Sequence, residues 1–175
     1  DIFNQYAQSL RDLGLLLWFF RLGLIAIFML HIYSAIRLTR LNRLANPVSY
    51  KKATYRQSTV VSRTMFLSGL VVLFFILYHL AHFTFRWTHP ELNDVSVYQI
   101  VVSSFQSPFV SFFYIASLVF LMMHLKHSLL SLFQTLGISH QNFNYILKQG
   151  TVVLTFFLGI GFVSIPVSIF LGVIR

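Results

Sequence analysis

Four long apolar segments constrain this chain more than any other feature of its sequence. They cover residues 13–38, 60–84, 109–133 and 151–174. Each has the roughly 20 residues, rising about 1.5 Å per residue, that an α-helix needs to cross a hydrocarbon core about 30 Å thick. No linker rich in Gly and Pro separates them. The sequence therefore predicts an all-α transmembrane helix bundle with four spanning helices, forming one domain over residues 1–175.

The composition excludes a water-soluble enzyme and a disordered tail. Hydrophobic residues make up 57% of the chain and charged residues only 10%, and 20 residues are Phe. A core of this size cannot hide that much apolar surface from water, so lipid must cover it. The chain has no Cys, which removes disulfides, iron–sulfur clusters and thiolate zinc sites. Metal chemistry would therefore depend on the seven histidines.

The positive charges predict an orientation in the membrane rather than nucleic-acid binding. Lys and Arg outnumber Asp and Glu by 13 to 4, and the first connection between spans holds Arg40, Arg43, Lys51, Lys52 and Arg56. The second connection has only Arg86 against Glu91 and Asp94. Because basic loops stay in the cytoplasm, we expect Asp1, the second connection and Arg175 outside, and the third connection, with Lys148, inside.

Three histidines lie at informative depths in the predicted spans. His31 and His124 each lie roughly 10–14 Å from the inner surface at 1.5 Å per residue. His79 lies nearly 30 Å from the inner end of its helix by the same rise, hence in the outer half. A buried membrane histidine usually marks a proton path, a polar pair or a metal ligand. The matched depth of His31 and His124 fits axial ligation of one haem, but also a hydrogen-bonded pair or a proton relay.

The remaining histidines carry weaker signals. His82 and His127 lie near helix ends, where a polar side chain can reach the interface, and a structural role is expected for both. His89 and His140 fall in connections.

The pairs His79/His82 and His124/His127 have metal-like spacing, but no intramembrane carboxylate accompanies them, which argues against zinc. Spacing alone leaves open which member of each pair faces the bundle. Small residues at Ser68-Gly69 could let a flat macrocycle approach the backbone.

An ordered set of motifs carries a family resemblance along nearly the whole chain. The set comprises His31 with Ile-Tyr-Ser-Ala-Ile-Arg after it, Ser62-Arg63-Thr64 leading to Ser68-Gly69 and Tyr78-His79, Phe113-Tyr114 leading to His124, and Gln134-Thr135-Leu136-Gly137. Together they resemble the cytochrome b membrane anchor of succinate:quinone oxidoreductases, of the five-helix, two-haem type. In that family four helices each give one axial His. The family's first helix has no counterpart here, so we expect an N-terminal region outside this sequence.

The resemblance assigns site residues. It implies that His31 and His124 hold the iron of the inner haem, and that His79 holds the outer haem iron with a histidine from the missing helix. The spacing of ten residues from Gly69 to His79 and from Tyr114 to His124 fits the family and favours these histidines over His82 and His127. Ser62 and Arg63 are implied as contacts of the inner haem propionates, although Arg63 equally suits a positive flank of the helix.

The resemblance also implies a function. Electrons from succinate oxidation by a flavoprotein subunit would pass through an iron–sulfur subunit and two haem b groups to quinone, by analogy menaquinone, at the bacterial inner membrane. The chain would be a subunit of succinate dehydrogenase or fumarate reductase without the dicarboxylate site, since it lacks a dinucleotide fingerprint and a phosphate loop. The alternatives are a haem-free transporter or proton relay using His31, His79 and His124, and a purely structural scaffold subunit.

Overall fold

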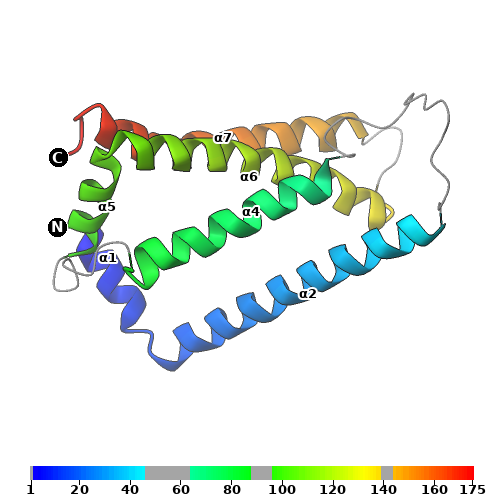
Figure 1. Cartoon of the computed structure of the whole chain (residues 1–175), viewed down its shortest axis with the longest axis horizontal. Coiled ribbons are helices and arrows are strands. Elements are labelled where there is room, and N and C mark those ends of the chain that lie inside the picture. The colour runs from blue at the N-terminus through cyan, green and yellow to red at the C-terminus, as the bar shows by residue number, and fades with distance from the viewer. Residues whose placement is uncertain (1, 46–63, 88–95, 139–143) are drawn as a thin grey trace. The chain divides into compact units, whose positions relative to one another are not determined.

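The structure is a computed structural model that describes residues 2–45, 64–87, 96–138 and 144–175 (Figure 1). Every regular element in these ranges is a helix. The chain divides into two compact units, Asp1–Gln57 and Ser58–Arg175. The expectation of one domain over residues 1–175 stays a prediction.

Four of the described helices are long and apolar enough to cross a membrane. They are α2 (Leu15–Ala45), the continuous pair α4 (Met65–His79) and η1 (Leu80–Thr84), α6 (Pro108–Thr135) and α7 (Asn144–Phe170). The predicted all-α class and the four spans are therefore confirmed, and the chain is a multi-pass membrane protein.

The first unit pairs a short polar helix with the longest span. Helix α1 (Ile2–Arg11) was not expected from the sequence. It ends in a turn at Gly14, whose φ of 53° lies in the left-handed region that glycine adopts without steric cost. Helix α2 then runs seven residues past the predicted end at residue 38, because the basic stretch up to Ala45 contains no helix breaker.

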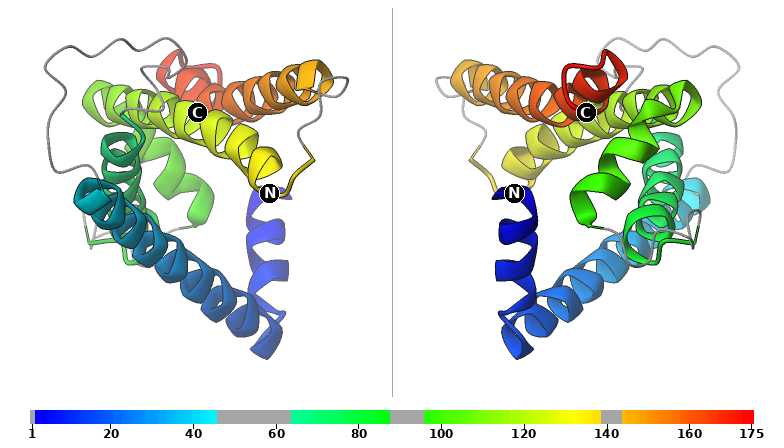
Figure 2. Two further views of the ribbon diagram at one scale, coloured as in Figure 1. Left: turned by 90° about the vertical axis from the view of Figure 1, so that its right-hand side faces the viewer. Right: turned by 90° about the vertical axis from the view of Figure 1, so that its left-hand side faces the viewer.

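The second unit is organised around α6. This helix contacts α4, α7 and the short helix α5 (Val97–Gln106), and Figures 1 and 2 show it between α4 and α7. Side chains from all four helices form the core: Phe75, Val102, Phe105, Tyr114, Leu118 and Ile169. Large apolar side chains also cover the outside, including Phe109, Phe112 and Phe157. Such a surface is suited to lipid rather than water.

Helix α5 lies in the second connection, where the sequence predicted a plain loop. Ser96 begins it with a capping box in which Gln99 is the partner, and the chain turns at Ser107 before Pro108 starts α6. The Ser111 hydroxyl donates to the Phe105 carbonyl at 2.6 Å and closes this corner. The Tyr98 hydroxyl donates to the carbonyl of Arg175 at 2.8 Å. The second connection and Arg175 therefore share one end of the unit, as the alternating topology predicts.

Candidate functional site

His124 lies on the face of α6 that packs against α4. Its imidazole is half-buried, and its Nδ1 atom is 3.1 Å from the Ser68 hydroxyl oxygen in the first turn of α4. Helix packing thus brings together two residues 56 positions apart in the sequence. The predicted inner ligand has a defined polar partner on the neighbouring helix.

Ser68 has two partners that share its single hydroxyl. It lies 2.9 Å from the Met65 carbonyl and 3.1 Å from Nδ1 of His124. When the hydroxyl donates to Met65, its oxygen accepts from Nδ1–H of the neutral imidazole. In that tautomer the lone pair is on Nε2. A histidine whose Nδ1–H is held by a hydrogen bond while Nε2 carries the lone pair is the usual form of a metal ligand.

Gly69 allows the close approach of this ring to α4. A Cβ atom added at Gly69 would lie 3.4 Å from Cε1 and 3.9 Å from Nδ1 of His124. A single methyl group would therefore touch the ring, and a larger side chain would push it away. From the sequence, we expected Gly69 to let a flat macrocycle approach the backbone of this helix. In the structure, the His124 imidazole makes that close approach.

His79 lies at the other end of the same helix pair. It is the last residue of α4, and its side chain is exposed in the second unit. The centroid of its ring lies 6.1 Å from that of Tyr114 and 5.5 Å from that of Phe83. Tyr114 lies in the second turn of α6, whereas His124 lies ten residues further on and faces the beginning of α4. The two helices run antiparallel, so His79 and His124 differ in level, as the depth argument expects.

His82 is buried, which contradicts the expectation that it reaches the membrane interface. Its side chain is only 1% exposed, and its Nδ1 atom forms a 2.9 Å hydrogen bond with the Tyr114 hydroxyl. His82 lies in η1, a π-helical turn whose wider winding rotates residues relative to the α-helix before it. The His82 side chain therefore lies inside the core, in a cluster of aromatic rings with Tyr78 and Phe83.

The other predicted site residues are placed less fully. His31 lies on α2, where it is exposed within the first unit, and its pairing with His124 stays a prediction. His127 is half-buried one turn beyond His124. The remaining candidates, Ser62, Arg63, His89 and His140, lie outside the described residues.

Two polar partners of the histidines were not identified from the sequence. Ser68 was noted for its small size, but not as a hydrogen-bond partner of His124. Tyr114 was noted only for its spacing from His124, although its hydroxyl binds His82. A serine or tyrosine inside an apolar span is a detectable signal, because a buried hydroxyl needs a partner. The identity of the partner depends on the neighbouring helix.

Comparison with known proteins finds no match to this chain among family models, curated proteins or solved structures.

Proposed function

We propose that this chain is a haem b-containing membrane anchor of a succinate:quinone oxidoreductase in the bacterial inner membrane. It would carry electrons from an iron–sulfur subunit, itself supplied by a flavoprotein subunit, to quinone, by analogy menaquinone. His31 and His124 would hold the inner haem and His79 the outer haem. The dicarboxylate chemistry would belong to the partner subunits.

The observation that carries the proposal is the state of His124. Ser68 lies against its Nδ1 atom, and the tautomer with Nδ1–H toward Ser68 carries the lone pair on Nε2. Haem iron binds an axial imidazole through such a lone pair. Gly69 gives the His124 ring its place against α4, and Val72 and Phe75 on the same helix are buried in apolar surroundings. The donor chemistry of His124 therefore supports the group that the sequence resemblance implies.

The accessibility of the second histidine pair agrees with the same assignment. His79 presents an exposed ring at the end of α4, whereas His82 is enclosed and bonded to Tyr114. A histidine that binds haem iron must have its ring nitrogen accessible to the haem, not enclosed by neighbouring side chains. The geometry therefore favours His79 over His82 as the outer ligand, as the family spacing does.

The residues of the chain would act by binding, orienting and excluding water. Haem b, when bound, supplies reversible one-electron transfer between ferric and ferrous iron. His124 would bind through Nε2 while Ser68 keeps its ring in one orientation. The packed helices α4 and α6 would fix the distance between the two ligand levels, and their apolar side chains would lower the polarity around each site.

The core between His79 and His124 contains both apolar side chains and buried hydroxyls. Gly69 and His79 are ten residues apart, hence about 15 Å along α4. The buried side chains between the two levels include Val72, Phe75 and Leu118. Electrons can cross such an apolar gap. The buried hydroxyls of Tyr114 and Ser117, which precede His124 on α6, are groups that a proton relay would use, so the optical experiment decides between the two functions.

A reduced-minus-oxidised optical spectrum of the purified protein, produced from its full coding sequence, tests the proposal. Haem b bands, together with quinone reduction by succinate when the partner subunits are present, are expected. A folded, monodisperse protein without haem bands would overturn the proposal and favour the haem-free relay. Haem bands that survive the combined loss of His31, His79 and His124 would also overturn it, because other residues would then bind the iron.

A further inference from the structure

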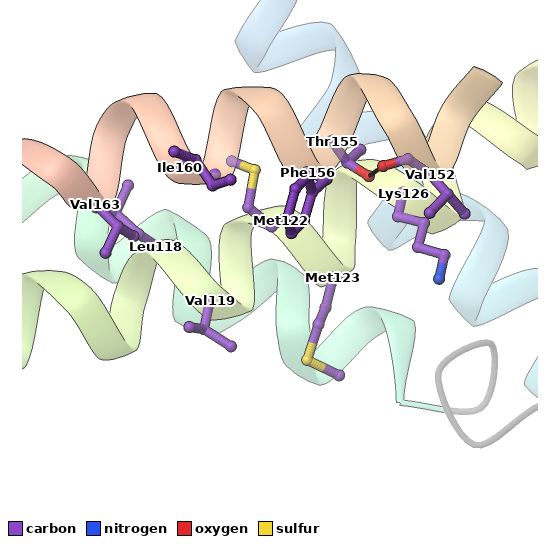
Figure 3. Close-up of a pocket in the computed structure, with 11 residues that line it drawn as sticks. Leu118, Val119, Met122, Met123, Lys126, Val152, Thr155, Phe156, Ile160 and Val163 are labelled. Carbon is purple, nitrogen blue, oxygen red and sulfur yellow. Dashed lines mark hydrogen bonds between the residues drawn. The ribbon is translucent and has the colours of Figure 1, made fainter. Parts of the chain in front are cut away.

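A groove between α6 and α7 offers a second candidate site, on a different face of α6 from His124. It is open along its length, has a volume of about 450 Å³, and is lined mainly by apolar side chains. Figure 3 shows Leu118 and Val163 at one end and Lys126 and Val152 at the other. Because α6 also packs its His124 face on α4, the groove is separate from the proposed haem ligand.

Close packing of the two helices forms the floor of this groove. A Cβ atom at Gly159 would lie only 3.2 Å from Cγ of Met122, so the glycine lets Met122 lie across α7. Beside this contact, Phe156 and Ile160 are 64% and 52% exposed. The hydroxyl of Thr155 is bonded to the carbonyl of Thr151 within its own helix. The walls therefore offer an occupant apolar contact and almost no hydrogen bonding.

Positive charge is concentrated at one end of the groove. Lys126 lines it directly, and Lys148 lies one helical turn before Val152 on the same face of α7. The four acidic residues of the chain are at positions 1, 12, 91 and 94, so neither α6 nor α7 contains a carboxylate. The occupant must therefore combine an apolar body with a negative charge at the lysine end.

The length of the groove matches one leaflet of a bilayer. From Val152 to Val163 it follows eleven residues of α7, which is roughly 16 Å at 1.5 Å per residue. Half of a hydrocarbon core about 30 Å thick is roughly 15 Å. The lysines thus lie about one acyl-chain length from the deep end.

We propose that this groove binds an anionic phospholipid, with an acyl chain against Met122 and Ile160 and its phosphate between Lys126 and Lys148. Basic pockets between helices on the cytoplasmic side bind such headgroups because each nearby lysine adds attraction for the anionic lipid. By the predicted orientation, the lysine end of the groove faces the cytoplasm. The site does not depend on haem binding.

Lipid retention measured by native mass spectrometry tests the proposal. The full-length protein is reconstituted in phosphatidylcholine containing a minor fraction of phosphatidylglycerol, and is then released in mild detergent. Wild type is expected to retain phosphatidylglycerol in preference to phosphatidylcholine. In the double variant Lys126→Gln/Lys148→Gln, the ratio of retained phosphatidylglycerol to retained phosphatidylcholine should fall at least about tenfold. The matched control Arg40→Gln/Arg43→Gln removes the same charge from α2 and should keep it.

A second variant tests the apolar half of the site. Ile160→Trp fills the groove without changing charge, and it alters an exposed residue that the fold does not need buried. It should reduce retention of phosphatidylglycerol while the helical circular dichroism is unchanged. Equal losses in the lysine and arginine variants, no preference for phosphatidylglycerol in wild type, or a quinone displaced by Ile160→Trp in place of the lipid would each overturn the proposal.

Discussion

At the residue scale, His124 differs from its neighbour His127 by its contact with Ser68 on the facing helix. The Ser68 hydroxyl lies 3.1 Å from the Nδ1 atom of His124 and 2.9 Å from the Met65 carbonyl. His127, one turn along α6, follows His124 closely in sequence but lies at a different angle on the helix. The two residues therefore form a matched pair for testing ligand identity.

Replacement of His124 by Ala should remove the inner haem and leave any outer haem in place. The control His127→Ala should retain both, because its ring does not provide the Nε2 atom that Ser68 orients. The haem content of purified variants, from pyridine haemochrome spectra, checks this. Haem loss in His127→Ala but not in His124→Ala would reverse the assignment within the pair.

Replacement of Ser68 by Ala should leave the inner haem bound but raise its reduction potential by roughly 20–40 mV. A hydrogen-bond acceptor on Nδ1–H makes the imidazole a stronger donor, and a stronger donor stabilises the ferric form. A redox titration followed optically measures the shift. Ser68→Thr keeps the hydroxyl and should restore the original potential, whereas equal potentials in all three proteins would contradict this role for Ser68.

At the element scale, the end of the second span is shaped by the π turn η1. The turn directs His82 into the core, where it binds Tyr114, and leaves His79 exposed at the end of α4. Two histidines three residues apart thereby receive different environments. The buried His82–Tyr114 pair links the second and third spans at the same end as α5.

Removal of the Tyr114 hydroxyl should destabilise the helix packing. Tyr114→Phe leaves the Nδ1 atom of buried His82 without this partner, at a cost of about 1–3 kcal/mol in the free energy of unfolding. Tyr145, which is 71% exposed on α7, provides the control Tyr145→Phe, expected to stay within about 0.5 kcal/mol of wild type. Equilibrium unfolding in detergent measures both, and equal stabilities would show that the hydrogen bond contributes nothing.

Enlargement of Gly69 should displace His124 from α4. A single Cβ atom already lies 3.4 Å from the imidazole, so Gly69→Val should largely abolish the inner haem, while Gly69→Ala should reduce its occupancy less. Gly161 on α7 has no atom within 4 Å of an added Cβ, and Gly161→Val serves as the control. Haem occupancy measured optically distinguishes them. Full occupancy in Gly69→Val would show that the site does not need this close approach.

At the scale of the whole molecule, the proposal takes one inner-haem ligand from each compact unit, His31 from the first and His124 from the second.

The pairing predicts identical effects of His31→Ala and His124→Ala. Each should remove the same haem, and the double variant should lose no more than either single variant, since an iron that needs two imidazoles is lost with the first. His79→Ala should remove the other haem. Redox titration of all four proteins checks this. Loss of different haems in His31→Ala and His124→Ala would separate the two residues.

The sequence by itself determined the spans, the helical class and the relative sides of the connections. These features depend on the hydrophobicity and the length of each apolar segment, and neither depends on which residues are neighbours in space. The extra helices α1 and α5 were missed because short helices depend on caps and packing more than on hydropathy.

Only the tertiary structure decided which of His79 and His82 turns inward, and which side chains lie against His82 and His124. The spacing of three residues leaves both members of a pair in one sector of a helix. His82 lies buried in the π turn whereas His79 before it is exposed, and a serine on the facing helix lies within hydrogen-bond distance of His124 Nδ1. Side-chain direction and hydrogen bonding are set by the packing between helices, which hydropathy does not encode.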